Sequence, residues 1–274
     1  MATVYIAPTA QGTGDGTSAA NAYAFSSLST AESDAGNGGT ILFTDGDYNT
    51  ATNSFQNGGS TLATLTYKSL NPLGARLIET SAYSYLLIGS TSGAFATTTI
   101  IKDFYVQNLY YYPAQSAATY QLSGIKQLDT INNNASVTSS GLLNGRSNTL
   151  AHTVNNCSFT FKVGTTSSFF NDAGAMNVNN TSIHLVTDST NANGIGQYTG
   201  TAPTLKNTII SVDASGKLNS AALDISKITY SCLYNTPETV SGTNIDDDPQ
   251  FVDSATGDLR LRPSSPCIGT GTAS

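Results

Sequence analysis

Apolar residues occur along the chain in short runs that alternate with polar positions. The runs are rich in β-branched and aromatic residues, and clusters of Gly, Asn, Ser and Asp separate them. Runs of this kind lie at 61–67, 98–106, 159–163, 183–186, 208–212 and 259–261. The pattern predicts short β-strands joined by tight turns.

A short motif recurs through the central part of the chain. V-N-N-C-S-F at 154–159 is followed 24 residues later by V-N-N-T-S-I at 178–183. The frame apolar-x-Asn gives a series of asparagines, with Tyr230-Ser231-Cys232 as a sixth member. These are Asn108, Asn132, Asn156, Asn180 and Asn207. A fixed period of this size is typical of stacked repeats, and strand-like segments favour a β-solenoid of about 24 residues per coil.

Stacked coils give the repeated asparagines a structural role. A residue that recurs once per coil lies about 4.8 Å from its copy in the next coil. The Asn side chain both donates and accepts hydrogen bonds, so a column of asparagines can form an amide ladder. We therefore expect Asn108, Asn132, Asn156, Asn180 and Asn207 to form such a ladder.

The two ends of the chain differ from its middle. Residues 23–36 carry apolar residues at helical spacing, at Ala24, Phe25, Leu28 and Ala31, and end near Gly36. This predicts a short amphipathic helix that covers the first coil. We expect one domain over 1–274, with a strand-and-helix cap in 1–50, laddered coils in 60–235 and a closing coil in 236–274.

Both ends carry a family resemblance. The chain opens with a strand, the turn Gly14 to Thr17, the expected helix, and then G-T-I-L-F and G-D-Y at 39–43 and 46–48. It closes with D-P-Q-F-V-D, G-D-L-R-L and S-P-C-I-G. These segments resemble right-handed parallel β-helix proteins of the pectate-lyase-like superfamily, closest in character to those borne by phages. The resemblance implies an all-β fold, but the superfamily includes lyases, hydrolases, tailspikes, adhesins and inert modules.

The net charge and the N-terminal residues indicate which partners and which location to expect. The formal net charge is −7, and only 11% of residues are charged. A nucleic acid or an anionic membrane would need a basic face, so we expect neither as a partner. The chain starts M-A-T-V-Y-I-A-P without a signal-peptide pattern. We expect a virion-surface or extracellular location without a signal peptide.

Cofactor chemistry has little support in the sequence. The cysteines are Cys157, Cys232 and Cys267, with no C-x-x-C pair, so we expect neither zinc nor disulfide staples. The acidic run Asp246-Asp247-Asp248 could bind calcium, but its place before Pro249 favours turn formation. We expect no metal and no cofactor.

Candidate binding and catalytic residues are few. Tyr110, Tyr111 and Tyr112 lie together on one expected strand, so at least one faces out, where it could contact a protein or a sugar. Polysaccharide lyases and hydrolases of the resembled superfamily need acidic and basic residues on one face. The residues that could share such a face are Asp103, Asp129, Lys102 and Lys126, with Arg146 and His152 on coils beyond.

The function expected from these features is structural. We expect a non-catalytic surface protein of a bacteriophage virion, a capsid decoration or a tail spike, that contacts other virion proteins and could also contact a cell-surface glycan. The resemblance further implies a homotrimer. A polysaccharide lyase or glycoside hydrolase, and a bacterial adhesin module, remain as alternatives.

Overall fold

The computed structural model is all-β with one short helix. It describes residues 2–49, 55, 63–79, 84–88, 97–113, 118–129, 141–144, 151–163, 168–171, 175–187, 196–197, 202–213 and 223–272. In this part of the chain, helix α1 (Leu28–Ala35) is the one α-helix, and short 3-10 turns occur at Ala19–Asn21, Phe25–Ser27, Ile225–Lys227 and Ser254–Thr256.

Among the described residues, three parallel sheets contain every strand except β24 and β25, and within each sheet neighbouring strands are joined by hydrogen bonds. Sheet A runs in the order β2 (Tyr23–Ala24), β1 (Thr3–Ala7), β3 (Thr40–Phe43), β5 (Thr64–Ser69), β8 (Thr97–Lys102), β11 (Ala118–Ser123), β14 (His152–Asn155), β17 (Met176–Asn179), β20 (Thr204–Lys206) and β22 (Ile228–Thr229). Sheet B runs in the order β23 (Cys232–Tyr234), β21 (Ile209–Val212), β18 (Ser182–Thr187), β15 (Ser158–Val163), β12 (Lys126–Leu128), β9 (Tyr105–Gln107), β6 (Ala75–Ile78) and β4 (Gly46–Asn49). Sheet C runs in the order β19 (Gly196–Gln197), β16 (Ser168–Asn171), β13 (Gly141–Asn144), β10 (Leu109–Pro113) and β7 (Ser84–Ile88).

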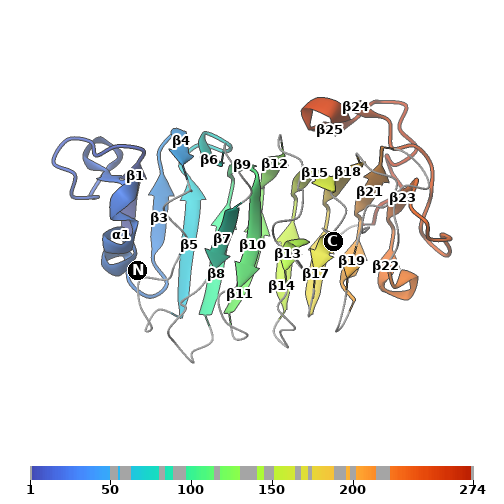
Figure 1. Cartoon of the computed structure of the whole chain (residues 1–274), viewed down its shortest axis with the longest axis horizontal. Coiled ribbons are helices and arrows are strands. Elements are labelled where there is room, and N and C mark those ends of the chain that lie inside the picture. Colours follow the sequence, from blue (N-terminus) through green and yellow to red (C-terminus); the bar gives the residue numbers. More distant parts are fainter. Residues whose placement is uncertain are drawn as a thin grey trace.

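The chain visits the sheets in a repeating order. From β5 to β19 the strands belong to sheets A, B and C in turn, and each pairs in parallel with the strand of the same sheet in the next coil. In Figure 1 the strands follow one another along the long axis, from α1 at one end to β22 and β23 at the other. The expected solenoid-like stacking of parallel strands is therefore present.

The core lies between the sheets and runs along the stack. Alternate residues of each strand point inward, as in β5, where Leu65 and Tyr67 are fully buried. Aromatic rings fill the first coils around Phe43 and the middle ones around Phe159 and Phe169. Because each inward residue packs on its copies above and below, burial extends from one coil to the next.

The connections from sheet A to sheet B share one geometry. From β8 onward each is a corner of two residues, and the first of them has a φ between 49° and 65° in six successive coils. These residues are Asp103, Gly124, Asn156, Asn180, Asn207 and Tyr230. The left-handed conformation costs most L-residues about 1–2 kcal/mol, and Gly, Asn and Asp adopt it most readily. The corner's backbone therefore explains the asparagines of the repeat.

The second corner residue is buried in all six coils. In the last four it is Cys157, Thr181, Thr208 or Ser231. Its hydroxyl or thiol donates to the carbonyl oxygen two residues earlier, at 2.9 Å for Thr181 and 2.8 Å for Ser231. The Ser231 oxygen also accepts from the backbone N–H of Thr208 in the coil before, at 3.1 Å. This column of small polar residues satisfies buried backbone groups that would otherwise lack partners.

The asparagine ladder is present only in part. Asn207 donates from Nδ2 to Oδ1 of Asn180 at 3.0 Å, and in the neighbouring column Asn179 donates to Asn155 at 3.1 Å. Asn156 and Asn180 are exposed rather than buried. Amide stacking therefore accompanies the corner, while the left-handed backbone is the feature that all six coils share.

One of the expected ladder members, Asn108, does not belong to this column. Asn108 follows β9 at a different corner, where its Nδ2 donates to the carbonyl oxygen of Glu79 at 2.6 Å. Asn132 lies outside the described residues.

The number of residues per coil is not a constant 24. Lys102 pairs with Ser123, 21 residues later, and Ser123 pairs with Asn155, 32 residues later. Asn108 and Asn156 are two spacings of 24 apart in the sequence, but they occupy different corners of the coil.

Substitution of Tyr230 tests whether the left-handed backbone of the corner explains the preference for Asn. It is the one large side chain in the left-handed column, and 37% of its surface is exposed. We expect Tyr230→Asn to raise the free energy of unfolding by about 0.5–1 kcal/mol, because Asn tolerates this conformation better. Thermal denaturation measures the gain. Tyr230→Ala is the control, since it removes the ring but leaves a left-handed L-residue, and an equal gain there would refute the explanation.

The N-terminal cap agrees with the helix expected there. Helix α1 buries Leu28, Ala31, Glu32 and Ala35, and it packs on β1 and β3. Gly36, with φ 66°, ends the helix. The expected end near Gly36 is confirmed, and so is the burial of Leu28 and Ala31. The expected start near residue 23 is wrong, because Tyr23–Ala24 pair with β1 as β2 and Phe25–Ser27 form a 3-10 turn before the helix begins.

The C-terminal segment differs from the closing coil that was expected. Ile245 still pairs with Cys232 in parallel, so the stack continues to this point. Beyond it, β24 (Phe251–Asp253) and β25 (Asp258–Leu261) form a separate antiparallel hairpin. Figure 1 shows this hairpin lying over the end of the stack that carries β15, β18 and β21. We call residues 246–265 the closing segment.

Candidate functional site

The closing segment covers part of the outer face of sheet B, over β18 and β21. Thr160, His184, Ser211 and Tyr234 pair in register on successive strands, with side chains on the side away from the core. Such positions normally face water, yet Thr160, His184 and Ser211 are at most 8% exposed. The ring of Phe251 on β24 lies edge-on to His184, with ring centroids 6.2 Å apart.

Contacts at the hairpin hold this cover in place. Gly257, which has a φ of 75°, fits closely against Leu128, since a Cβ there would lie 3.2 Å from Cδ1 of that leucine. Within the segment, Ser265 donates from Oγ to the carbonyl oxygen of Pro249 at 2.6 Å, and Arg262 N donates to the carbonyl oxygen of Gln250 at 3.0 Å. The segment therefore has its own hydrogen bonds and docks as a unit.

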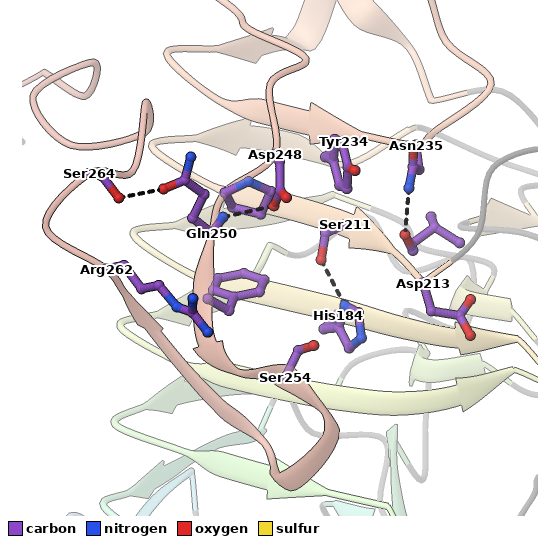
Figure 2. Close-up of a pocket in the computed structure, with 13 residues that line it drawn as sticks. His184, Ser211, Asp213, Tyr234, Asn235, Asp248, Gln250, Ser254, Arg262 and Ser264 are labelled. Atoms are coloured by element: carbon purple, nitrogen blue, oxygen red, sulfur yellow. Dashed lines mark hydrogen bonds between the residues drawn. The ribbon is translucent and has the colours of Figure 1, made fainter.

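A groove of about 440 Å³ opens between sheet B and this cover. Residues of β18, β21 and β23 line one side, and the closing segment lines the other (Figure 2). The lining residues are His184, Ser211, Val212, Asp213, Tyr234, Asn235, Asp248, Pro249, Gln250, Phe251, Ser254, Arg262 and Ser264. We call this hollow the closing groove.

His184 lies at the floor of the closing groove. Its Nδ1 is 2.8 Å from Oγ of Ser211, and Figure 2 shows the hydroxyl pointing toward the ring. Burial lowers the pKa of His184, while the charge of Asp213 raises it by less. The imidazole is therefore held neutral, so it can share a proton with the hydroxyl.

The groove carries charge of both signs. Asp213 accepts through Oδ1 from the Thr187 hydroxyl at 2.7 Å, and Asp248 accepts from the backbone N–H of Gln250 at 2.8 Å. Arg262 donates to the carbonyl oxygen of Val252 at 3.1 Å. Each group keeps further hydrogen-bonding capacity, because a carboxylate has several acceptor positions and a guanidinium has five donors.

Two lining residues have a left-handed backbone. Asn235 has a φ of 56° and Gln250 a φ of 52°. Asn235 is further fixed by a bond from its Nδ2 to the carbonyl oxygen of Val212 at 3.1 Å, and Gln250 accepts from the Ser264 hydroxyl at 2.7 Å. Backbone strain of this kind often accompanies ligand sites, and here it sets the shape of both walls.

The lowered pKa of His184 makes stability depend on pH. The unfolded chain binds a proton at this histidine near pH 6.5, whereas the folded chain binds it only at lower pH. The contribution of neutral His184 is therefore complete above pH 6.5 and falls as the pH drops below that value. We expect His184→Gln to flatten the fall in melting temperature between pH 6.5 and 5. An unchanged slope in the variant would contradict this assignment.

The tyrosines expected to bind a partner lie away from this groove. All three are on β10 in sheet C, and Tyr111 is fully buried, with its ring 6.2 Å from that of Tyr120. Tyr111 therefore cannot contact a partner at the surface. The side chains of Tyr110 and Tyr112 lie outside the described part of the structure.

The acidic and basic residues considered for catalysis do not form one cluster. Asp103 is a corner residue whose carboxylate lies 3.8 Å from the ammonium of Lys68. Asp129 is buried and accepts from the backbone N–H of Asn108 at 3.0 Å. His152 faces the core and stacks on Tyr120 at 4.2 Å.

The remaining members of that set are equally dispersed. Lys102 ends β8 in sheet A, whereas Lys126 begins β12 in sheet B, and Arg146 lies outside the described residues. The acidic run also has a turn role, at least at Asp248. Among the described residues, no three His, Cys, Asp or Glu side chains are placed to hold a metal ion.

Sequence reasoning missed the closing groove. The alternation in I-H-L-V at 183–186 places His184 opposite the core, which was the available signal. Its partners Ser211 and Phe251 come from distant segments that no local pattern connects.

No family model, curated protein or solved structure matches the chain. Within the described residues, no helix is long and apolar enough to span a membrane.

Proposed function

We propose that this protein is a non-catalytic attachment protein that binds a carbohydrate in the closing groove. The observation that carries the proposal is the lining of the groove, which combines polar side chains of both hydrogen-bonding types with the rings of Tyr234 and Phe251. Ligand sites are typically concave, with a few fixed polar groups beside aromatic surface.

Sugar chemistry suits this lining better than other ligand classes. Each sugar hydroxyl donates and accepts, and the groove offers acceptors at Asp213 and Asp248, donors at Arg262, and amides at Asn235 and Gln250. Aromatic rings provide an apolar surface for the C–H face of a sugar. The opposed charges and the net charge of −7 disfavour a polyanion such as nucleic acid.

The biological setting is also part of the proposal. The resemblance of the opening segment and the stack of parallel strands support a right-handed parallel β-helix displayed on a bacteriophage particle, as a capsid decoration or a tail spike. In that setting the solenoid contacts other virion proteins or two further copies of itself. The groove at its end contacts a cell-surface glycan.

Groove variants test carbohydrate binding directly. We expect Arg262→Ala and Asp248→Asn each to weaken binding of a glycan selected on an array by about tenfold or more, since each removes a hydrogen bond to a charged group. Isothermal titration calorimetry measures the change. Arg76→Ala is the matched control, because Arg76 pairs with Asp47 at 2.7 Å on β4 and β6, away from the groove. If all three variants bind the glycan as tightly as the wild-type protein, the closing groove is not the carbohydrate site.

A glycoside hydrolase is the second candidate. Its supporting observation is that two carboxylates, Asp213 and Asp248, line the same groove, as the acid and the base or nucleophile of a glycosidase do. Release of reducing sugar that Asp213→Asn abolishes would favour the hydrolase. Binding without any release by the wild-type protein would favour attachment.

A further inference from the structure

Two cysteines lie near one another where the last described residues of the chain meet the stack. Cys232 begins β23 and is 2% exposed, and Cys267 follows the closing segment and is partly exposed. Both line a small cavity of about 240 Å³ beside the corner residues Asn180 and Asn207. The side chains of Cys232 and Cys267 interact, and this interaction is the largest cause of the pKa shift of each thiol.

Each cysteine is held by contacts of its own. Cys232 pairs with Ile209 in sheet B, and its thiol donates to the carbonyl oxygen of Asp247 at 3.1 Å. The backbone N–H of Cys267 donates to Oγ of Ser265 at 3.2 Å. Five residues further on, the N–H of Thr272 donates to the corner residue Asn207 at 2.9 Å. Both sulfurs therefore approach from anchored backbone rather than from free loops.

We propose that Cys232 and Cys267 are a redox-sensitive pair, which a small-molecule disulfide such as oxidised glutathione converts into an intramolecular disulfide. This differs from the expectation of a chain without disulfides, which rested on the odd number and wide spacing of the cysteines. The third cysteine, Cys157, is accounted for separately by its place in the corner column.

The electron balance requires two exchange steps. The Cys267 thiolate attacks the oxidant's sulfur–sulfur bond, forming a mixed disulfide and releasing one glutathione thiolate. The Cys232 thiol then loses its proton and attacks the Cys267 sulfur, releasing the second glutathione. The two protein thiols together lose two electrons and two protons, and these reduce the oxidant's disulfide to two thiols.

The environment of each sulfur agrees with this order of attack. The interaction with Cys232 lowers the pKa of Cys267, burial raises it by less, and a hydrogen bond with Ser265 lowers it further. Cys267 is also the more exposed of the two cysteines. The interaction with Cys267, followed by burial, raises the pKa of Cys232. The more exposed thiol thus forms the thiolate first, and the buried one acts as the resolving group.

The disulfide would close a loop that contains the outer wall of the closing groove. The residues from Tyr234 to Ser264 that line the groove all lie between Cys232 and Cys267. Oxidation would therefore fix the closing segment to sheet B, whatever the groove binds. The pair can form its bond even if the carbohydrate proposal fails, because its chemistry needs no ligand.

A tryptic map of the full chain tests the bond. The protein is incubated with oxidised glutathione, alkylated, digested without reduction and analysed by mass spectrometry. Cleavage after Lys227 and Arg260 places Cys232 and Cys267 on peptides 228–260 and 261–274, and Cys157 falls on a third peptide, 147–162. We expect the peptides 228–260 and 261–274 to be joined, and the intact chain to lose the mass of two hydrogen atoms.

Stability gives a second readout. We expect oxidation to raise the melting temperature of the wild-type protein by roughly 5–10 °C. The shift should persist in Cys157→Ser and vanish in Cys267→Ser. Free thiols on both peptides after oxidation, a glutathione that stays on Cys267, or a link between two chains would each overturn the proposal.

Discussion

Replacing Phe43 by alanine is expected to lower the free energy of unfolding of the N-terminal coils by about 3–5 kcal/mol. Phe43 on β3 is fully buried, and it is the centre of the aromatic cluster in the first coils. Its ring lies 5.1 to 6.5 Å from five others, those of Phe25, Tyr48, Phe55, Tyr67 and Phe104. The cavity would remain largely unfilled, because these rings are fixed by one another.

Hydrogen exchange should locate this loss. In stacked repeats each coil depends mainly on its neighbours, so β1, β3 and β5 should lose protection while β20 to β23 retain it. Phe43→Leu is the control, since it keeps most of the volume and should cost less than about 1.5 kcal/mol. A uniform loss of protection along the whole chain would show that the coils unfold together, in conflict with a neighbour-by-neighbour stack.

Tyr67→Phe is expected to destabilise the N-terminal cap by about 1–3 kcal/mol, because it removes a donor from a buried carboxyl group. The Tyr67 hydroxyl donates to Oε1 of Glu32 at 2.7 Å, and the two side chains are 0% and 1% exposed. This bond joins helix α1 to β5 in the core. Burial, followed by the charge of Glu32, holds the pKa of Tyr67 well above its ordinary value, so the phenol remains protonated and can donate.

A double variant separates the bond from the packing. Removing both partners should cost less than the two single changes together, because part of the penalty of Tyr67→Phe is the loss of one donor to a carboxyl group that stays buried. We therefore expect Tyr67→Phe with Glu32→Leu to recover part of the loss, as measured by urea denaturation. Strictly additive losses would mean that the hydrogen bond contributes little.

The sequence predicted the fold through features that are local and repeated. Strand runs, the motif around Asn156 and Asn180, and the spacing in 23–36 each reflect a nearby backbone requirement. The cause of the asparagine repeat was less evident, since amide ladders and left-handed corners both favour Asn. Gly124 and Asp103 occupy the same corner and separate the two explanations, because neither has an amide side chain.

The closing groove could not be predicted in the same way. It forms where Phe251 covers His184, and these residues belong to segments that no repeat connects. The resemblance placed the end of the chain in a further coil, whereas the antiparallel pairing of β24 and β25 turns it back over sheet B. Residues that point away from the core and are nevertheless buried indicate that another segment covers the strand. Their burial can be seen only once the fold is known.

The contact between the closing segment and sheet B underlies both proposals, and it can be tested most directly in solution. Nuclear Overhauser effects between ring protons of His184 and Phe251 measure it. We predict a cross-peak between these rings, whose centroids are 6.2 Å apart, alongside the stronger one between Tyr120 and His152 at 4.2 Å. Absence of the first, with the second observed, would contradict the closing groove and the position assigned to the end of the chain.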